Sequence, residues 1–265
     1  MSSISIYILT HKRFDYDGDE LYVPLLNGSA TYEDDFGYVR DDSGENISNL
    51  NSYYAELTGE YWAWKNSKSD IIGFCHYRRY FAKNLLLNKK IGKEDIENIL
   101  KEYDIITPKK NNLTKSNLEN ISESFYNWNY GTNPKEYEKL RNIIERDYPE
   151  YLKSYDEVLQ LKWCYWFNIF ICKKELADKY FEWLFDILKK MENEINFDEY
   201  ENKRVLGFLS ERLLTVFIIK NNLKVKENYI IFSESKTPHI SVLGFRFPIL
   251  VDISNVLKKF ILKLK

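Results

Sequence analysis

The chain has 265 residues, with 38 Lys and Arg against 40 Asp and Glu and a formal net charge of -2. A hydrophobic fraction of 44% with 16% aromatic residues suffices for a sizeable core, which excludes disorder over most of the length. The balanced charge argues against a general nucleic-acid-binding protein, which needs a basic surface. No apolar run is long enough to span a bilayer, and no secretory signal is recognised. Three cysteines in apolar segments fit a reducing compartment, so we expect a cytosolic protein.

The hydrophobic pattern predicts alternating strands and helices. In chain order, the expected elements are a strand at 4–9, long loops at 13–50, a helix at 52–66 capped by Asn51 or Ser52, strands at 71–80 and 104–108, helical sequence at 134–160, a strand at 166–171, and helices at 176–191 and 204–220. No linker divides the chain, so we predict one α/β domain over residues 1–250. Long polar loops such as 13–50 are usually functional.

The C-terminal residues 251–265 are predicted to form a separate basic amphipathic tail. From Ser254 onward, apolar residues recur at helical spacing and every charge is a lysine. Such a helix can lie on an anionic membrane surface, where each lysine contributes about 1 kcal/mol. A terminal helix packed on its own domain explains the pattern equally well.

The densest cluster of polar and aromatic residues is His76-Tyr77-Arg78-Arg79-Tyr80, at the end of an apolar segment. If the strand continues through it, His76, Arg78 and Tyr80 share one face. Ligands of α/β sheets bind at the carboxyl ends of strands. Two arginines directly after an apolar run are costly to bury unless they pair with anions, and a diphosphate suits the planar guanidinium group. The alternative is an ion-paired structural arginine beside a core histidine.

Two further segments are candidates for the same site. Thr10-His11-Lys12 ends the first expected strand and could border a base or ribose, although exposed loop residues are the commoner outcome. In the helix after residue 203, Arg204, Gly207 and Glu211 share one stripe.

An interior helix glycine costs about 1 kcal/mol relative to alanine, so Gly207 suggests a close approach. Glu211 beside that gap could act as a general base if burial raises its pKa. The alternative is an ordinary intrahelical ion pair of Glu211 with Arg204 or Arg212.

Familiar cofactor and metal motifs are absent from the sequence. The acidic run Asp15-Tyr16-Asp17-Gly18-Asp19 lacks the glycine and glutamate positions of a calcium loop, and it does not follow an apolar strand. We interpret it as a solvated acidic loop. There is no nucleophile elbow, phosphate loop or dinucleotide fingerprint, which disfavours serine hydrolases, nucleoside triphosphatases and nicotinamide enzymes.

Taken together, the segments resemble one family. The matching blocks are Asn51-x-x-Tyr54-x-Glu56-Leu57-Thr58-x-x-Tyr61-Trp62-x-Trp64-Lys65-Asn66, then Asp70-x-x-Gly73-x-x-His76-Tyr77-Arg78-Arg79-Tyr80, then Asn168-Ile169-Phe170-Ile171, then Arg204-Val205-x-Gly207-Phe208-Leu209-Ser210-Glu211-Arg212-Leu213. This pattern resembles the capsular and exopolysaccharide synthesis proteins once catalogued as domain of unknown function 4422, now a galactofuranosyltransferase family. The likeness runs from Ile6 to about Phe232.

The resemblance implies a bacterial glycosyltransferase with a GT-A-like, single Rossmann-type nucleotide-sugar transferase domain, a central mixed sheet and flanking helices. It implies inverting transfer from UDP-galactofuranose to an undecaprenyl-diphosphate-linked oligosaccharide, at the cytoplasmic face of the cell membrane. In related folds the strand after a helix like 52–66 ends in a metal-binding Asp-x-Asp. Here that place holds His76-Tyr77-Arg78, so we expect cationic side chains to replace the metal and no cofactor to be needed.

The site that follows from this resemblance has four parts. Its expected members are Thr10, His11 and Lys12 at the nucleotide; His76, Arg78 and Arg79 at the donor diphosphate; Asn168, Arg204 and Tyr80 at the sugar or acceptor; and Glu211 as the catalytic base. Trp62 and Trp128 are candidate sugar-stacking faces, whereas the spacing of Trp64 favours the core. The chain departs from the family pattern at Tyr126–Tyr130, where it has asparagines instead of histidine, and His239 lies beyond the matched region.

Two alternatives stay open at this point. One is a hexopyranosyltransferase of the same fold that uses UDP-galactose or UDP-glucose. The other is a non-catalytic glycan-binding subunit of a polysaccharide assembly complex, which gives no reason for two arginines beside a histidine.

Overall fold

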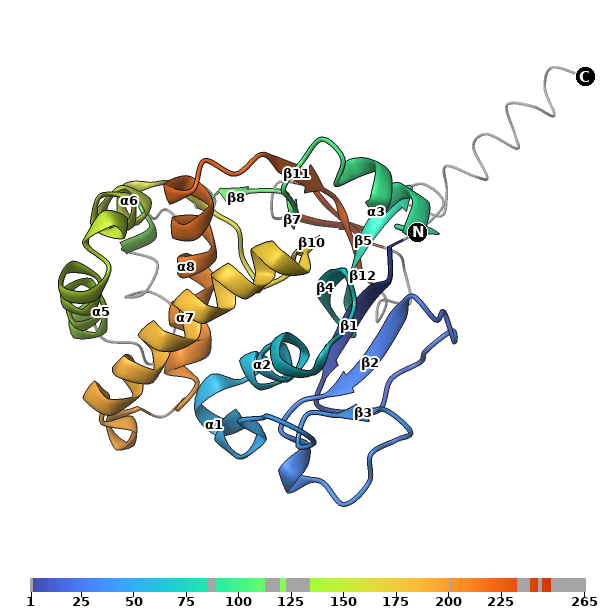
Figure 1. Ribbon diagram of the computed structural model, residues 1–265, viewed down its shortest axis with the longest axis horizontal. Helices are drawn as coiled ribbons and strands as arrows, with labels where there is room; N and C mark the ends of the chain where they lie inside the picture. The colour runs from blue at the N-terminus through green and yellow to red at the C-terminus, as the bar shows by residue number, and fades with distance from the viewer. Residues whose placement is uncertain are drawn as a thin grey trace, which may run out of the picture.

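The computed structural model describes residues 2–84, 89–112, 120–122, 134–200, 202–232, 239–242 and 245–248. A mixed β-sheet forms its centre, with a thick layer of helices on one face and the short helix α3 on the other (Figure 1). The predicted α/β fold class is confirmed.

The main sheet runs in the order β3-β2-β1-β4-β10-β7-β11. Its strands are β1 (Ile4–Thr10), β2 (Tyr22–Leu26), β3 (Val39–Arg40), β4 (Ile71–His76), β7 (Ile105–Pro108), β10 (Ile171–Lys173) and β11 (Val225–Asn228). Strand β10 is antiparallel to both of its neighbours, and the other neighbouring pairs are parallel. The carboxyl ends of the parallel strands therefore meet at one edge, where ligands of α/β sheets bind.

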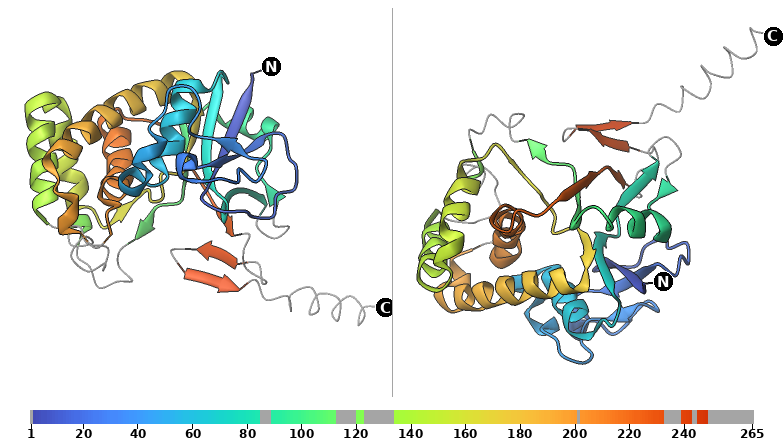
Figure 2. Two further views of the ribbon diagram at one scale, coloured as in Figure 1. Left: turned by 90° about the horizontal axis from the view of Figure 1, so that it is seen from below. Right: turned by 45° about the horizontal axis from the view of Figure 1, so that its top comes forward.

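A smaller branch of strands leaves the sheet at the end of β4. It contains β5 (Arg79–Asn84), β6 (Lys89–Lys90), β12 (Ile230–Phe232), β13 (His239–Val242) and β14 (Phe245–Pro248). The β13–β14 hairpin lies apart from the helices (Figure 2). Strands β8 (Asn111–Asn112) and β9 (Trp163–Cys164) pair separately.

Helices cover both faces of the main sheet. They are α1 (Asn51–Tyr54), α2 (Leu57–Asn66), α3 (Lys93–Ile99), α5 (Pro134–Asp147), α6 (Pro149–Gln160), α7 (Lys174–Glu194) and α8 (Val205–Lys220), with short 3-10 turns at Ser29–Thr31, Ser48–Leu50 and Phe197–Glu199. Helices α5 to α8 gather on one side (Figures 1 and 2).

Side-chain alternation along the strands builds a core on each face of the sheet. In β1, Tyr7 and Leu9 join the large core under α2 and α5 to α8, whereas Ile6 and Ile8 join the smaller core that includes Ile96 of α3. All four β1 side chains are buried, as expected for a strand covered on both faces.

Several expected boundaries are wrong, for local reasons. The 13–50 region contains β2 and β3 instead of loops alone. The expected helix 52–66 breaks at Ala55, whose φ is 53°. Neither expected cap is observed, and the Asn51 side chain instead donates to the Ala55 carbonyl and to Thr58 Oγ1. The helical region 134–160 is two helices, since Pro149 begins α6.

Two expected strands are also wrong. The segment 71–80 is a hairpin in which His76 pairs with Arg79, so Tyr77 and Arg78 form its turn. His76, Arg78 and Tyr80 therefore do not share the one strand face that the sequence predicted. In the expected strand 166–171 only the last residue is in a strand, because Phe167 and Asn168 have φ values of 79° and 52°.

The predicted strands at 4–9 and 104–108 and the helices at 176–191 and 204–220 are confirmed within a few residues. Within the described part of the chain, no helix has the length and apolar character needed to cross a bilayer. The tail 251–265 and the segment 126–130, with Trp128, lie outside the described residues.

Candidate functional site

Strands β1 and β4 end side by side at the carboxyl edge of the sheet. Leu9 is in register with His76, and the Tyr77 N–H donates to the Leu9 carbonyl at 3.3 Å. This pairing brings the segments 10–12 and 76–79 together, as the sequence suggested. The residues expected at the nucleotide and those expected at the donor diphosphate therefore share one edge.

Three basic side chains surround the buried ring of Tyr77. The ring of His11 meets it edge-on at 5.5 Å between centroids, Lys12 Nζ lies 4.9 Å from its centre, and Arg78 Cζ lies 5.0 Å away. His11, Lys12 and Arg78 are exposed. The arrangement holds basic groups on a rigid aromatic support, which suits an anionic ligand.

Arg79 and His76 form a second, more buried pair. Arg79 Nη1 donates to His76 Nδ1 at 3.1 Å, and because a guanidinium group has no acceptor, the proton of the imidazole lies on Nε2. Burial, with the charges of Arg79 and Arg78, lowers the pKa of His76 to about 3. His76 is thus neutral near pH 7 and orients Arg79 rather than adding charge. Arg79 Cζ also lies 4.2 Å from the centre of the Phe167 ring.

Helix α8 approaches the break between α1 and α2 very closely. A Cβ atom on Gly207 would lie 3.3 Å from both Ala55 Cβ and the Tyr54 carbonyl oxygen, tighter than most Cβ contacts. The expected reason for a glycine at this position is therefore confirmed. The approach places the first turns of α8 against Glu56, which follows the strained Ala55.

Asn168 joins these two elements. Its Nδ2 donates to Glu56 Oε1 at 3.1 Å and to Ser210 Oγ at 2.9 Å, and the residue is 1% exposed. A buried non-glycine residue with positive φ persists only where its surroundings fix it. Asn168 is thus a fixed bridge between α2 and α8.

Glu211 follows Ser210 and is 17% exposed. Burial raises the pKa of Glu211 to about 7; Arg212 opposes this shift, Glu56 adds to it and Arg79 opposes it. Arg212 Nη1 lies 3.2 Å from Glu211 Oε2. A carboxyl group with a pKa near the working pH is suited to accept a proton from a hydroxyl group.

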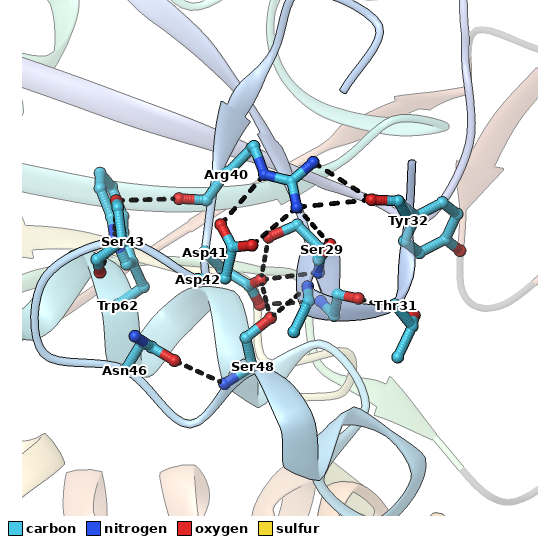
Figure 3. A network of polar contacts seen from close by, with 12 residues as sticks. Ser29, Thr31, Tyr32, Arg40, Asp41, Asp42, Ser43, Asn46, Ser48 and Trp62 are labelled. Carbon is cyan, nitrogen blue, oxygen red and sulfur yellow. Dashed lines mark hydrogen bonds and ion pairs between the residues drawn. The ribbon is translucent and has the colours of Figure 1, made fainter. Parts of the chain in front are cut away.

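The loop beside β1 is held by a buried carboxylate (Figure 3). Asp41 accepts hydrogen bonds from the Gly28 and Ser29 N–H groups at 2.8 and 2.9 Å and from the hydroxyls of Ser29 and Ser48 at 2.7 and 2.5 Å. The network fixes the loop 27–48, whose first N–H donates to the carbonyl at the end of β1. The rim of the site is therefore ordered by the fold itself.

Comparisons with known proteins place this arrangement in a family. Residues 5–222 match the family model described as a domain of unknown function, DUF4422. The chain belongs to the DUF4422 family. The search of curated proteins found no match.

One solved structure is similar to the DUF4422 chain over nearly its whole length. It is described as the apo structure of WbbM, a bifunctional glycosyltransferase, with 30% sequence identity and a TM-score of 0.82. The match covers 94% of this chain and 48% of WbbM, so the chain spans about half the length of that protein. The DUF4422 chain therefore has a glycosyltransferase fold.

The remaining expected site residues of the DUF4422 chain are dispersed. Thr10 is buried, and its hydroxyl donates to the Lys12 carbonyl at 2.7 Å. Arg204 is exposed just before α8; burial raises the pKa of Glu56, and the nearby charge of Arg204 opposes that rise. Tyr80 instead belongs to the opposite core, beside Tyr22.

Tyr80 lines a hollow of 190 Å³ that is shared with the acidic loop. The other lining residues are Asp15, Tyr16, Asp17, Lys90, Ile231 and Phe232. Asp17 pairs with Lys90 at 2.8 Å, so part of the acidity of the loop is balanced within the fold. The described residues contain no group of three or more His, Cys, Asp or Glu side chains placed to hold a metal.

The tryptophans divide as their spacing suggested. Trp64 stacks on Phe185 with centroids 5.7 Å apart and belongs to the core. Trp62 is partly buried, and its indole N–H donates to the Ser43 carbonyl at 2.9 Å. Neither ring is presented as a free stacking face.

Sequence reasoning missed Glu56, Phe167 and Ser210. In the structure Glu60 is fully buried and Glu56 is half-buried. The available signal for Glu56 was its spacing: Glu56 and Glu60 lie four residues apart, on the side of the predicted helix that faces away from its aromatic residues. Because the helix break at Ala55 has no sequence mark such as glycine or proline, its effect on Glu56 could not be foreseen.

Proposed function

We propose that the chain is a glycosyltransferase that transfers a sugar from a nucleotide diphosphate donor to a hydroxyl group of a glycan. Glu211 carries the proposal, because a buried carboxyl with a pKa of about 7 lies beside the basic edge of the sheet. The similarity to WbbM, described as a bifunctional glycosyltransferase, supports the same reaction class.

The donor binds at the carboxyl ends of β1 and β4 in this proposal. Thr10, His11 and Lys12 border the nucleotide. Arg78 and Arg79 pair with the diphosphate and stabilise the negative charge that develops on the leaving UDP. His76 contributes by holding Arg79, since the imidazole is neutral.

Glu211 is the general base. It takes the proton of the acceptor hydroxyl as the oxygen forms a bond with the anomeric carbon of the donor. The bond from that carbon to the diphosphate oxygen breaks, and UDP leaves with the electron pair. One displacement inverts the configuration at the anomeric carbon, which gives a β-linkage from an α-linked donor. Asn168 and Arg204 are assigned to the sugar or acceptor side, whereas Tyr80, which lies in the opposite core, is not.

We further propose that the donor is UDP-galactofuranose and the acceptor an undecaprenyl-diphosphate-linked oligosaccharide of capsule or exopolysaccharide synthesis. These assignments rest on the family resemblance. They place the enzyme at the cytoplasmic face of the membrane, held in part by the basic tail 251–265. The competing donors are UDP-galactose and UDP-glucose, and the competing class is a non-catalytic glycan-binding subunit.

A UDP-release assay with purified protein separates these possibilities. We expect release from UDP-galactofuranose in the presence of a lipid-linked glycan acceptor, and little release from either pyranose donor. Preference for a pyranose donor would reassign the sugar. No release from any donor, combined with binding of the glycan, would favour the non-catalytic subunit.

The proposed enzyme needs no divalent metal, because Arg78 and Arg79 supply positive charge where related transferases use an ion. Full activity in the presence of a chelator is the expected result. Activity that is lost with chelator and restored only by Mn²⁺ or Mg²⁺ would contradict this part of the proposal.

A further inference from the structure

Glu56 is a second carboxylate within the cluster that contains Glu211, and the proposed reaction assigns it no role. It lies at the start of α2, directly after the strained residue Ala55. A strained backbone at a candidate site persists because the surrounding structure holds it, at a cost of about 1–3 kcal/mol per residue. Here the Asn51 side chain donates to the Ala55 carbonyl at 2.7 Å and fixes the break.

The Glu56 carboxylate is connected to the helix turn that carries Glu211. Glu56 Oε1 accepts a hydrogen bond from Asn168, and the same amide nitrogen donates to Ser210 Oγ. The Ser210 hydroxyl in turn donates to the Gly207 carbonyl at 2.7 Å. A continuous chain of hydrogen bonds therefore runs from Glu56 to the residue before Glu211.

We propose that Glu56 is a positioning residue for Glu211: it anchors the first turns of α8 through Asn168 and Ser210, and it keeps a second carboxylate next to the proposed base. The inference rests on the proposed function for the meaning of Glu211 as a base. The geometric connection itself does not depend on that function.

The charged groups around Glu211 come from several elements. Arg212 on α8 and Arg79 on β5 favour its ionised form, whereas Glu56 favours its protonated form. The phenol of Tyr137 on α5 and the thiol of Cys164 on β9 also lie near Glu211. Burial raises the pKa of both groups above its ordinary value, so both are neutral near pH 7. Among these neighbours, Glu56 is the one whose negative charge opposes ionisation of Glu211. Burial raises the pKa of Glu56 as well, and the hydrogen bond from Asn168 and the charges of Arg204 and Arg79 oppose that rise and favour the carboxylate.

The substitution Glu56→Gln separates charge from shape. Glutamine keeps an oxygen that can accept from Asn168 but removes the negative charge. We therefore expect Glu211 to titrate at a lower pH in the variant, by about half a unit to one unit, as is typical for loss of a nearby like charge.

The titration can be followed without any activity. The protein is labelled with ¹³C at the glutamate side-chain carboxyl carbons, and the resonance of Glu211 is identified by its loss in Glu211→Gln. The matched control is Glu192→Gln. Glu192 of α7 accepts a hydrogen bond at 2.9 Å from Tyr54, which lies at the same helix break, and it also pairs with Lys189.

The expected result is a lower midpoint for Glu211 in Glu56→Gln and an unchanged midpoint in Glu192→Gln. An unchanged midpoint in Glu56→Gln, or equal shifts in both variants, would overturn the inference. If Glu56→Gln does not fold, Glu56→Asp serves instead, because it moves the charge back by one methylene group. The Glu211 midpoint should then fall by a smaller amount, and an unchanged midpoint in Glu56→Asp would contradict the inference.

The inference can also be tested through activity, by measuring kcat for UDP release as a function of pH. The acidic limb of kcat should move to lower pH in Glu56→Gln together with the Glu211 midpoint. Absence of transfer by the wild-type chain with every donor would remove the proposed function, whereas the carboxyl titration would still decide whether Glu56 controls Glu211.

Discussion

Arg79 Nη1 donates to His76 Nδ1 at 3.1 Å across the turn between β4 and β5. The imidazole is held in its neutral form, because burial and the adjacent guanidinium groups lower its pKa to about 3. This single contact fixes both the tautomer of the histidine and the orientation of the arginine. It makes His76 a support for Arg79 in the proposed donor site.

Removing the acceptor at His76 should weaken donor binding. In His76→Phe, Arg79 loses this hydrogen bond, and we expect UDP to bind about tenfold more weakly, since a hydrogen bond to a charged group contributes about 1.5 kcal/mol or more. His76→Asn keeps an acceptor near the Nδ1 position and should retain most of the affinity. Calorimetric titration with UDP measures both variants. Equal losses in the two would show that ring volume, not the hydrogen bond, matters.

The buried carboxylate of Asp41 should matter far more for stability than that of its half-buried neighbour Asp42. Asp41→Asn replaces one acceptor oxygen of the network in Figure 3 with a donor group, which even at the Oδ2 position would face the Gly28 N–H, and we expect a loss of about 2–3 kcal/mol. The matched control is Asp42→Asn, which removes an ion pair with Arg40 at the surface and should have a much smaller effect. Urea unfolding compares them. Similar losses in both variants would contradict this account of the loop.

Glu60 should make the protein less stable as the pH rises. Its side chain is fully buried, and neither carboxylate oxygen has a hydrogen-bond partner among the residues that the structure describes. Burial raises the pKa of Glu60 well above the ordinary value, with Glu56 adding to the shift. The folded state therefore favours the protonated form. Its stabilising effect is complete below the pKa of the unfolded chain, about 4.3, and is lost as the pH rises toward the folded-state pKa.

The substitution Glu60→Gln removes this dependence. We expect the Tm of the variant to exceed that of the wild type by an amount that grows from pH 5 to pH 8. Glu94→Gln, at an exposed position of α3, is the control, and its difference in Tm from the wild type should stay constant from pH 5 to pH 8. A difference in Tm between Glu60→Gln and wild type that becomes smaller with rising pH would contradict this account and show that the Glu60 carboxylate has a partner in solution.

Much of the fold follows from short-range patterns in the sequence. The apolar β-branched run in β1 and the periodic apolar faces of α7 and α8 specify their elements almost alone. The turn at Tyr77 and Arg78 could not be foreseen, because neither residue is a turn former and the segment reads as one continuous strand. The pairing of β4 with β5 overrides that local signal through tertiary contacts.

The site was accessible to sequence reasoning only in part. Strand ends identified the segments 10–12 and 76–79, and the interior glycine pointed to Glu211. The bridge through Asn168 was out of reach, since it depends on a positive φ at a residue other than glycine and on the approach of α8 to Ala55. Such features arise from packing between segments more than 100 residues apart.

The most direct test of the central claim compares wild type with Glu211→Gln in UDP release and in UDP binding. Loss of a general base should lower kcat at least about 100-fold, while the Kd for UDP stays within about twofold because the diphosphate contacts are elsewhere. Glu157→Gln, exposed on α6, should behave as wild type. A Glu211→Gln enzyme that keeps most of its turnover would contradict the account and assign proton transfer to another group.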